Sequence, residues 1–499
     1  MNKIQATLAG AMMLAAATTA QAGGILTNTN QSIDFLRNPA RDASIALDGV
    51  YSNPAGVAFM PEGLHIGFNW QYARQTRTIT STNDFFKYGR KNNGQATKSF
   101  EGTADAPFIP SLQAAYNTGD WSWQLNLSVP GGGGSCEFAD GLGSFESVVG
   151  NIATQLTPFG AQGYDMDGYM EGRQYYFGIQ AGTAYKVNDH LSVYGGLRVL
   201  YGTATYKAKI SNIMVNVGED RYMNFGSFLQ TAATTVDNNI DLVNAGMAQY
   251  EAAGATAVPQ YAELVATKAQ LEGAKKSFSS LQKYSQGVNL LCNQSGVGVA
   301  PVIGVDYRLN DQFNFAAKYE FKTQMRMKNE STVFEASEIE AVNKYRDGES
   351  VNEDAPALLA IGAQWSPISD VRISAGWHHF FDKEADWYGN AQDELSHNSN
   401  ELLAGAEWDV TDRLTISAGG QLTRYGLTDE YMNDMSFVVN SYSLGFGFNY
   451  KATDKVTLKA AYFQTMYDTY DRVTTKQPLV SDSFTRTNRV LGLGVEVSL

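Results

Sequence analysis

The feature that most constrains the fold of this chain is an alternation of apolar with small or polar residues at every second position. From Leu491 to Leu499 every second residue is apolar, and Gly, Glu or Ser stands between them. The same alternation runs through residues 441–450, 413–422 and 313–322. A period of two places successive side chains on opposite faces of a β-strand. The chain is therefore predicted to be rich in strands that have one apolar face.

The connections between these strands carry a second signal. Long polar stretches alternate with very short turns that contain Asn, Asp or Gly, residues that adopt hairpin conformations. A soluble sandwich would also alternate, so the pattern alone does not decide. Here, however, the polar face mixes Gly, Ser, Gln, Lys and Glu, and aromatic residues cluster at strand ends, which is typical of outer-membrane barrels. The short turns are 117–120, 187–190, 309–312, 368–370, 410–412 and 452–455.

Composition narrows the fold class further. No apolar run after the N-terminus approaches the roughly 20 residues of a membrane helix, which excludes a helical membrane protein. The content of 43% hydrophobic residues excludes a disordered chain. We predict an all-β fold, a 14-stranded antiparallel transmembrane β-barrel over residues 64–499. Its strands are expected near 64–79, 107–117, 121–130, 173–187, 191–207, 297–309, 313–326, 356–367, 371–382, 401–410, 413–425, 438–451, 456–468 and 489–499.

The N-terminus predicts export from the cytoplasm. Lys3 precedes an apolar run from Ile4 to Ala17, and Ala20-Gln21-Ala22 matches a cleavage site, so residues 1–22 are predicted to be a signal peptide. The formal net charge of −14 would repel nucleic acid, and no nucleic-acid partner is expected. The expected location is the outer membrane of a Gram-negative cell, as a multi-pass barrel.

Two stretches interrupt the strand pattern near the N-terminus. Residues 23–63 contain Pro and Gly too often for a membrane strand, and they predict either a hatch folded into the barrel or a flexible periplasmic extension. Pro130 and Gly131 begin a run of Pro and four Gly in the third strand. Because Pro removes a ladder donor and Gly removes side-chain packing, this strand must kink or end there.

Residues 228–284 lie within the longest connection and lack strand alternation. Apolar residues fall at helical spacing in two stretches that are broken near Gly254 and Pro259, so two helices are expected in an extracellular loop. The apolar stripes either pack against each other as a helical hairpin or offer a groove to a ligand. The candidate ligand-binding residues of such a groove are Leu229, Leu264, Phe278 and Leu281.

These features resemble the FadL/TodX family of outer-membrane transporters for long-chain fatty acids and hydrocarbons. The resemblance rests on the signal peptide, the stretch from Ala46 to Ala58 with Asp48 and Asn53-Pro54-Ala55, the fourteen strands and the Pro-Gly break in the third strand. It implies a barrel plugged by a hatch, which Asn53, Pro54 and Ala55 would shape. It also implies an inward kink at Pro130 and Gly131 that opens a lateral gap in the wall.

The resemblance further implies a passive route for a hydrophobic ligand, with capture at extracellular loops 131–172 and 208–296 and release into the membrane lipid. The expected partner is a long-chain fatty acid or another hydrophobic molecule, and the protein is expected to be a monomer. The alternatives are a general porin and a surface binding or adhesion barrel. The chain departs from the family in ending at Leu499 rather than an aromatic residue, in a second Asn-Pro-Ala at 38–40, and in its four successive Gly.

Other chemistry has weak support in the sequence. His378 and His379 are adjacent on a predicted strand and point to opposite faces, so they are poor partners for one metal ion. No enzyme activity, metal or cofactor is expected. Cys136 and Cys292 both fall at loop ends on the predicted outer side. They could form a disulfide in an oxidising compartment, or they could remain two free thiols.

Overall fold

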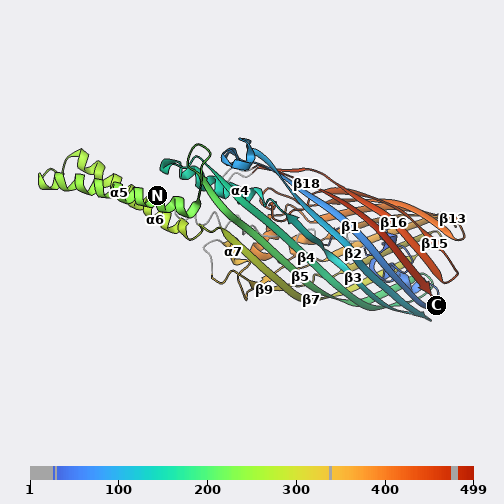
Figure 1. The fold of residues 1–499 in the computed structure, drawn as a ribbon. Coiled ribbons are helices and arrows are strands. Elements are labelled where there is room, and N and C mark those ends of the chain that lie inside the picture. Colours follow the sequence, from blue (N-terminus) through green and yellow to red (C-terminus); the bar gives the residue numbers. More distant parts are fainter. Residues whose placement is uncertain (1–25, 28–30, 336–339, 474–480) are drawn as a thin grey trace.

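The chain folds into one closed antiparallel barrel (Figure 1). This computed structural model describes residues 26–27, 31–335, 340–473 and 481–499. Eighteen strands form a single sheet, and its first and last strands, β1 and β18, pair with each other and close it. The predicted signal peptide, residues 1–22, lies outside the described residues.

Fourteen of the strands build the barrel wall, which confirms the predicted architecture. The other four, β6 (Tyr222–Asn224), β9 (Arg326–Ser331), β10 (Ser350–Asn352) and β17 (Tyr470–Val473), are short and pair above the wall. The wall strands are β1 (Gly63–Thr82), β2 (Thr97–Thr118), β3 (Trp121–Phe138), β4 (Gly163–Lys186), β5 (Leu191–Asn216), β7 (Val288–Arg308), β8 (Phe313–Glu320), β11 (Leu358–Ile368), β12 (Val371–Phe380), β13 (Ser399–Thr411), β14 (Leu414–Arg424), β15 (Ser441–Lys451), β16 (Val456–Tyr467) and β18 (Ser481–Ser498).

The polarity of the wall is that of a membrane barrel. On β7, Val297, Val299 and Ile303 are exposed on the outer surface, while Gln294 and Asp306 are buried in the interior. The same inversion recurs around the barrel, with apolar and aromatic side chains outside and Asn, Gln and Ser inside. An apolar outer band with a polar interior matches a barrel that faces lipid.

Several wall strands are longer than the sequence predicts. β5 has 26 residues, whereas a membrane strand needs about 9–11, so its far end rises well beyond the bilayer. Above Tyr201 the outward side chains of β5 become polar, and Lys207 and Lys209 are exposed. The alternation of apolar and polar faces therefore changes at this level. That change is why the sequence predicts a loop from residue 208 onward, whereas β5 continues to Asn216.

The helices gather at the long-loop end and in the barrel interior. The structure has the two loop helices that the sequence predicts, α5 (Phe225–Ala252) and α6 (Pro259–Gln282), and they project beyond the barrel (Figure 1). Gly254 takes a positive φ of 65° between them, and Pro259 begins α6. Within the described residues, no helix is both long and apolar enough to cross a membrane. The other helices are α2 (Ile33–Arg37), α3 (Gly49–Ser52), α4 (Gly143–Gln155) and α7 (Glu340–Asn343), with short 3-10 turns at 56–59, 84–88, 90–92, 157–159, 382–384 and 388–394.

Residues 31–62, which we call the hatch, lie inside the barrel against inward-facing glycines. A Cβ atom on Gly445 would lie 2.0 Å from the carbonyl oxygen of Leu36, and one on Gly405 would lie 2.1 Å from Asn38 Oδ1. Asp42 approaches Gly362 and Gly376 in the same way. Part of the high glycine content therefore has a steric cause, because the wall needs bare backbone where the hatch touches it.

The sequence leaves open a disulfide or two free thiols, and the structure contradicts the disulfide. Cys136 and Cys292 are both free and buried. Cys136 pairs with Gly172 on β4, Gly172 with Tyr206 on β5, and Tyr206 with Cys292 on β7. The two cysteines are therefore three strand spacings apart, about 14 Å, whereas a disulfide needs Cα atoms within about 7 Å.

The glycine contacts predict a selective effect on stability. Gly445→Ala should lower the unfolding temperature of the barrel, because the new methyl group must displace the hatch backbone at Leu36. Overpacking of this kind costs about 1–3 kcal/mol. Gly195→Ala is the matched control, since nothing lies within 4 Å of a Cβ atom there. Heat-induced loss of the compact band on gels measures both variants, and equal unfolding temperatures would contradict the steric account.

The positions of the cysteines predict their reactivity. Both thiols should resist a maleimide reagent in the folded barrel, because Cys136 and Cys292 are 5% and 0% exposed. Both should react after unfolding without a reducing agent. Mass spectrometry counts the attached groups. A protein that gains two labels only after reduction would show that the disulfide exists after all.

Candidate functional site

The ladder of the wall is interrupted over a long stretch between β2 and β3. Gly102 and Thr103 pair with Phe138 and Glu137, and pairing resumes only at Leu112 and Leu127. Residues 104–111 and 128–136 therefore have no ladder partner across this seam. On its other side β3 stays paired with β4, with register shifts between Ser128 and Gly131 and between Gly132 and Gly134. Extra residues in β3 thus bend it along β4 and away from β2.

Proline reduces the number of unpaired donors at this opening. Pro107 and Pro110 lie on the β2 edge and Pro130 lies on the β3 edge, and none of them has a backbone N–H. An unpaired N–H in a bilayer would cost several kcal/mol, by the usual order of magnitude. Gly132 has φ 119°, and a Cβ atom there would lie 2.4 Å from the carbonyl oxygen of Gln174. The bend therefore depends on glycine at this position.

Side chains satisfy carbonyl oxygens on both edges. Trp70 Nε1 donates to the carbonyl oxygen of Pro107 at 2.9 Å. Gln31 Nε2, from the hatch, donates to the carbonyl oxygen of Val129 at 3.2 Å. Ser111 Oγ donates in turn to the carbonyl oxygen of Gln31. The opening is thus stabilised by contacts from β1 and the hatch, and it is a built feature of the wall.

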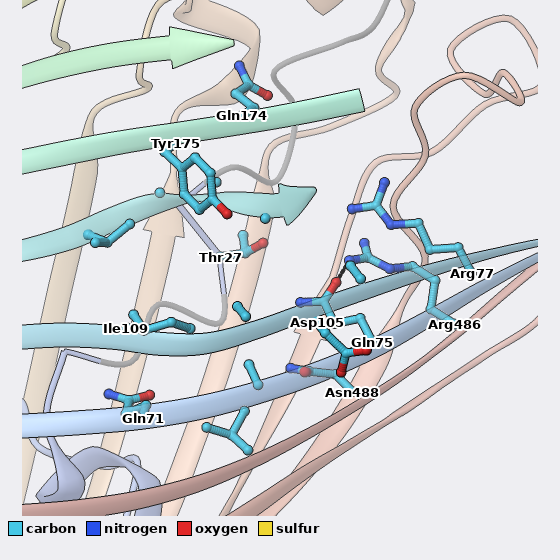
Figure 2. Close-up of a pocket in the computed structure, with 18 of the residues that line it drawn as sticks. Thr27, Gln71, Gln75, Arg77, Asp105, Ile109, Gln174, Tyr175, Arg486 and Asn488 are labelled. Atoms are coloured by element: carbon cyan, nitrogen blue, oxygen red, sulfur yellow. Dashed lines mark hydrogen bonds between the residues drawn. The ribbon is translucent and has the colours of Figure 1, made fainter. Parts of the chain in front are cut away.

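A cavity of about 410 Å³ lies behind the opening (Figure 2). Its apolar side follows the two edges of the opening, and includes Ala106, Phe108, Ile109, Val129 and Pro130. Its polar side carries inward side chains of β1 and β18. These are Gln71, Gln75, Arg77, Arg486 and Asn488. A ligand that has both an apolar and a polar part would match this division.

The loop before β15 covers the cavity. Ser436, Phe437 and Val438 line it, and Tyr425 Oη lies 2.6 Å from Thr27 Oγ1. The loop is held at Asp434, whose carboxylate accepts a hydrogen bond from the Ser144 N–H at 2.8 Å. Burial raises the pKa of Asp434 above its ordinary value. The cavity is therefore roofed on the extracellular side and open toward the wall.

The predicted hatch residues lie near the short-turn end of the barrel and form hydrogen bonds with several strands. Asn53 Nδ2 donates to Asp306 Oδ2 on β7 at 2.6 Å. The carbonyl oxygens of Pro54 and Ala55 accept hydrogen bonds of 2.7 Å each from Gln124 on β3 and Ser192 on β5. The Asn-Pro-Ala stretch is therefore fixed to strands on one side of the barrel.

Charged groups fix the opposite side of the hatch. Arg37 and Arg41 both pair with Glu407 of β13, at 2.6 and 3.0 Å. Asp34 pairs with Lys459 of β16 at 2.5 Å. Asp42 lies 3.0 Å from Nε2 of His378, whose Nδ1 faces Glu401. Breaking one partner of a buried pair is strongly destabilising, so these contacts hold the hatch firmly in the lumen.

The four residues expected to capture a ligand lie in the helical hairpin, as two groups. Leu229, Phe278 and Leu281 are buried in an apolar cluster at the base of the hairpin, where Phe278 packs on Phe159 with ring centroids 4.8 Å apart. Leu264 is further out and packs toward Gly246 of α5. None of the four lines the cavity behind the wall. The arrangement matches the self-packed hairpin rather than an open groove.

Metal binding has no support in the part of the chain that the structure describes. No group of three or more His, Cys, Asp or Glu side chains is placed to hold an ion there. Asp165 and Asp167, two neighbouring acids near the start of β4, approach Lys91, with distances of 3.5 and 2.6 Å to its Nζ. A lysine thus occupies the place that a cation would take.

Sequence reasoning located one edge of the opening and missed the other. Pro130 and Gly131 lie at the first register shift of β3. Pro107 and Pro110 carry the same signal on β2, since proline within a membrane strand marks an interrupted ladder. Arg77 and Arg486 were not singled out, because their closeness depends on the pairing of the first strand with the last.

Comparison with known proteins adds solved structures of the same fold. No family model matches the sequence, and no curated protein does. A FadL homologue from Pseudomonas aeruginosa superposes with a TM-score of 0.58 at 12% identity, over 95% of this chain and 99% of that chain. The toluene transporter TodX from P. putida superposes with a TM-score of 0.52 at 13% identity, over 97% of this chain and 99% of that chain. The chain therefore has the FadL/TodX fold of an outer-membrane β-barrel, which confirms at this level the resemblance drawn from its sequence.

Proposed function

We propose that the protein is a passive outer-membrane channel for hydrophobic small molecules, among them long-chain fatty acids. The observation that most supports this proposal is the opening between β2 and β3, with an amphipathic cavity directly behind it. In this proposal the ligand enters from the extracellular side, occupies the cavity and leaves sideways into the bilayer. The similar folds of the FadL homologue and the toluene transporter support the proposal.

The physical chemistry of such ligands favours a lateral route. Each CH₂ group gains about 0.8 kcal/mol when it leaves water, so an acyl chain moves readily from an apolar cavity into lipid. A water-filled pore would give no such gain. The edge residues Ala106, Ile109 and Val129 offer an apolar path between the cavity and the bilayer. Transfer along this path needs no energy source.

The hatch has a complementary role in this proposal. Its contacts to β3, β5 and β7 on one side and to β13 and β16 on the other leave the lateral opening as the exit. The helical hairpin would act as an extracellular collecting surface, with Leu242 and Val265 exposed on it. We expect the protein to work as a monomer, because the cavity and the opening are formed by one chain.

Narrowing the opening should reduce uptake. Ala106→Trp places a large ring at the β2 edge, and we expect uptake of radiolabelled oleate by cells to fall at least about fivefold. Ala181→Trp is the matched control, since Ala181 is exposed on the paired part of β4. It should leave uptake near the wild-type rate. Equal uptake by cells with either variant would rule out the lateral route. Equal uptake by cells with and without the wild-type protein would rule out oleate transport.

Removal of the hatch separates this proposal from a general porin. Deleting residues 31–62 should raise single-channel conductance and sugar flux severalfold, because the segment fills the lumen of the wild-type barrel. The variant Asn53→Ala serves as a milder test that keeps the barrel filled, and its conductance should stay low. Unchanged conductance after the deletion would mean that the hatch does not close the channel.

A further inference from the structure

Arg77 and Arg486 form a pair of cations on the wall of the cavity. The two residues are directly opposite each other in the pairing of β1 with β18, and both side chains point inward. Figure 2 shows the two guanidinium groups close together on one side of the cavity, across from Ile109 and Tyr175. Like charges placed directly opposite on a sheet destabilise it. The pair therefore needs a compensating interaction.

The described residues supply no anion to this pair. Neither arginine forms an ion pair among them, although the whole chain has a net charge of −14. Arg486 donates to Gln75 Oε1 at 3.1 Å and to the carbonyl oxygen of Phe437 at 3.4 Å. Arg77 lies over the Phe437 ring, 6.0 Å from its centroid. The Nε atoms of both arginines are buried without a hydrogen-bond partner in the described structure.

The nearest acidic side chain on the cavity lining is directed elsewhere. Asp105 is the single carboxylate among the described lining residues. Its Oδ1 accepts a hydrogen bond of 3.0 Å from Tyr72 Oη and lies 3.9 Å from Arg74 Nε, and both of those side chains belong to the outer face of β1. Arg486 also lies over the Tyr467 ring, 5.1 Å from its centroid. The two inward guanidinium groups thus contact aromatic rings and neutral oxygens, and none of the described residues gives them a carboxylate partner.

From this geometry we infer that Arg77 and Arg486 bind the anionic head of an amphiphile whose apolar chain lies along the opening. This inference rests on the proposed function, and it adds a charge requirement to it. The arginine pair would hold a carboxylate by charge-assisted hydrogen bonds, and Ala106, Ile109 and Val129 would contact the chain. A cavity of about 410 Å³ accepts a single chain rather than a lipid with several acyl groups.

The two arginines would therefore set specificity. A neutral hydrocarbon or alcohol gains nothing from them, and an anionic amphiphile gains contacts that are stronger than neutral hydrogen bonds. The same contacts would orient the ligand, with its head toward β1 and β18 and its chain toward the bilayer. In this orientation the apolar end of the ligand lies nearest the opening and enters the bilayer before the head group.

Binding of decanoate and decanol tests this inference, because the two probes share a chain and differ in head group. The protein is placed in phosphatidylcholine nanodiscs at pH 8, and empty nanodiscs give the blank, so that no anionic lipid competes. The wild type should bind decanoate at least about tenfold more tightly than decanol. The double variant R77Q/R486Q should lose this preference and keep its affinity for decanol.

Two further variants make the result specific. R74Q/R489Q removes an equal charge from the outer face of the same strands, where Arg74 and Arg489 are also opposite each other, and it should keep the full preference. R77K/R486K retains both charges and should keep most of it. A preference that survives in R77Q/R486Q, or is absent from the wild type, would overturn the anion site and leave the channel intact. A wild type that binds neither probe would overturn the proposed function itself.

Discussion

The hydrogen-bond ladder around the barrel is the constraint on which the rest of the structure depends. In lipid each backbone N–H and C=O group needs a partner, so a spanning sheet must close on itself. β1 and β18 provide that closure over their whole length. Between β2 and β3 the ladder is left open over residues 104–111 and 128–136. Two features lower the free-energy cost of this opening in a bilayer. Proline removes the backbone N–H at Pro107, Pro110 and Pro130, and the side chains of Trp70 and Gln31 donate hydrogen bonds to carbonyl oxygens at its edges.

The hatch fills the lumen, and for that reason the opening in the wall is the proposed route for a ligand. The hatch is fixed by buried charges such as Asp34 with Lys459, and by close contact of Leu36 with the bare backbone at Gly445. A filled lumen and an open seam together direct a ligand through the wall. The arginine pair behind the seam adds chemical selection to this geometry, since Arg77 and Arg486 lack an anionic partner among the described residues.

The sequence predicts the barrel well because lipid on one side and a polar interior on the other impose a strict two-residue period. Where that difference in environment disappears, prediction fails. The upper part of β5, residues 208–216, lies beyond the bilayer, and the sequence predicts a loop there. The sequence also does not reveal the register in which the strands pair. The separation of Cys136 from Cys292 and the closeness of Arg77 to Arg486 depend on that register, so neither could be predicted.

The central claim is that a hydrophobic ligand occupies the cavity at the β2–β3 seam on its way into the membrane. A crystal structure with decanoate brominated at its chain end tests this most directly, because the anomalous signal locates the bromine. We expect a bromine peak between Ala106 and Val129, at the seam. A peak in the lumen on the periplasmic side of the hatch, with none at the seam, would contradict it.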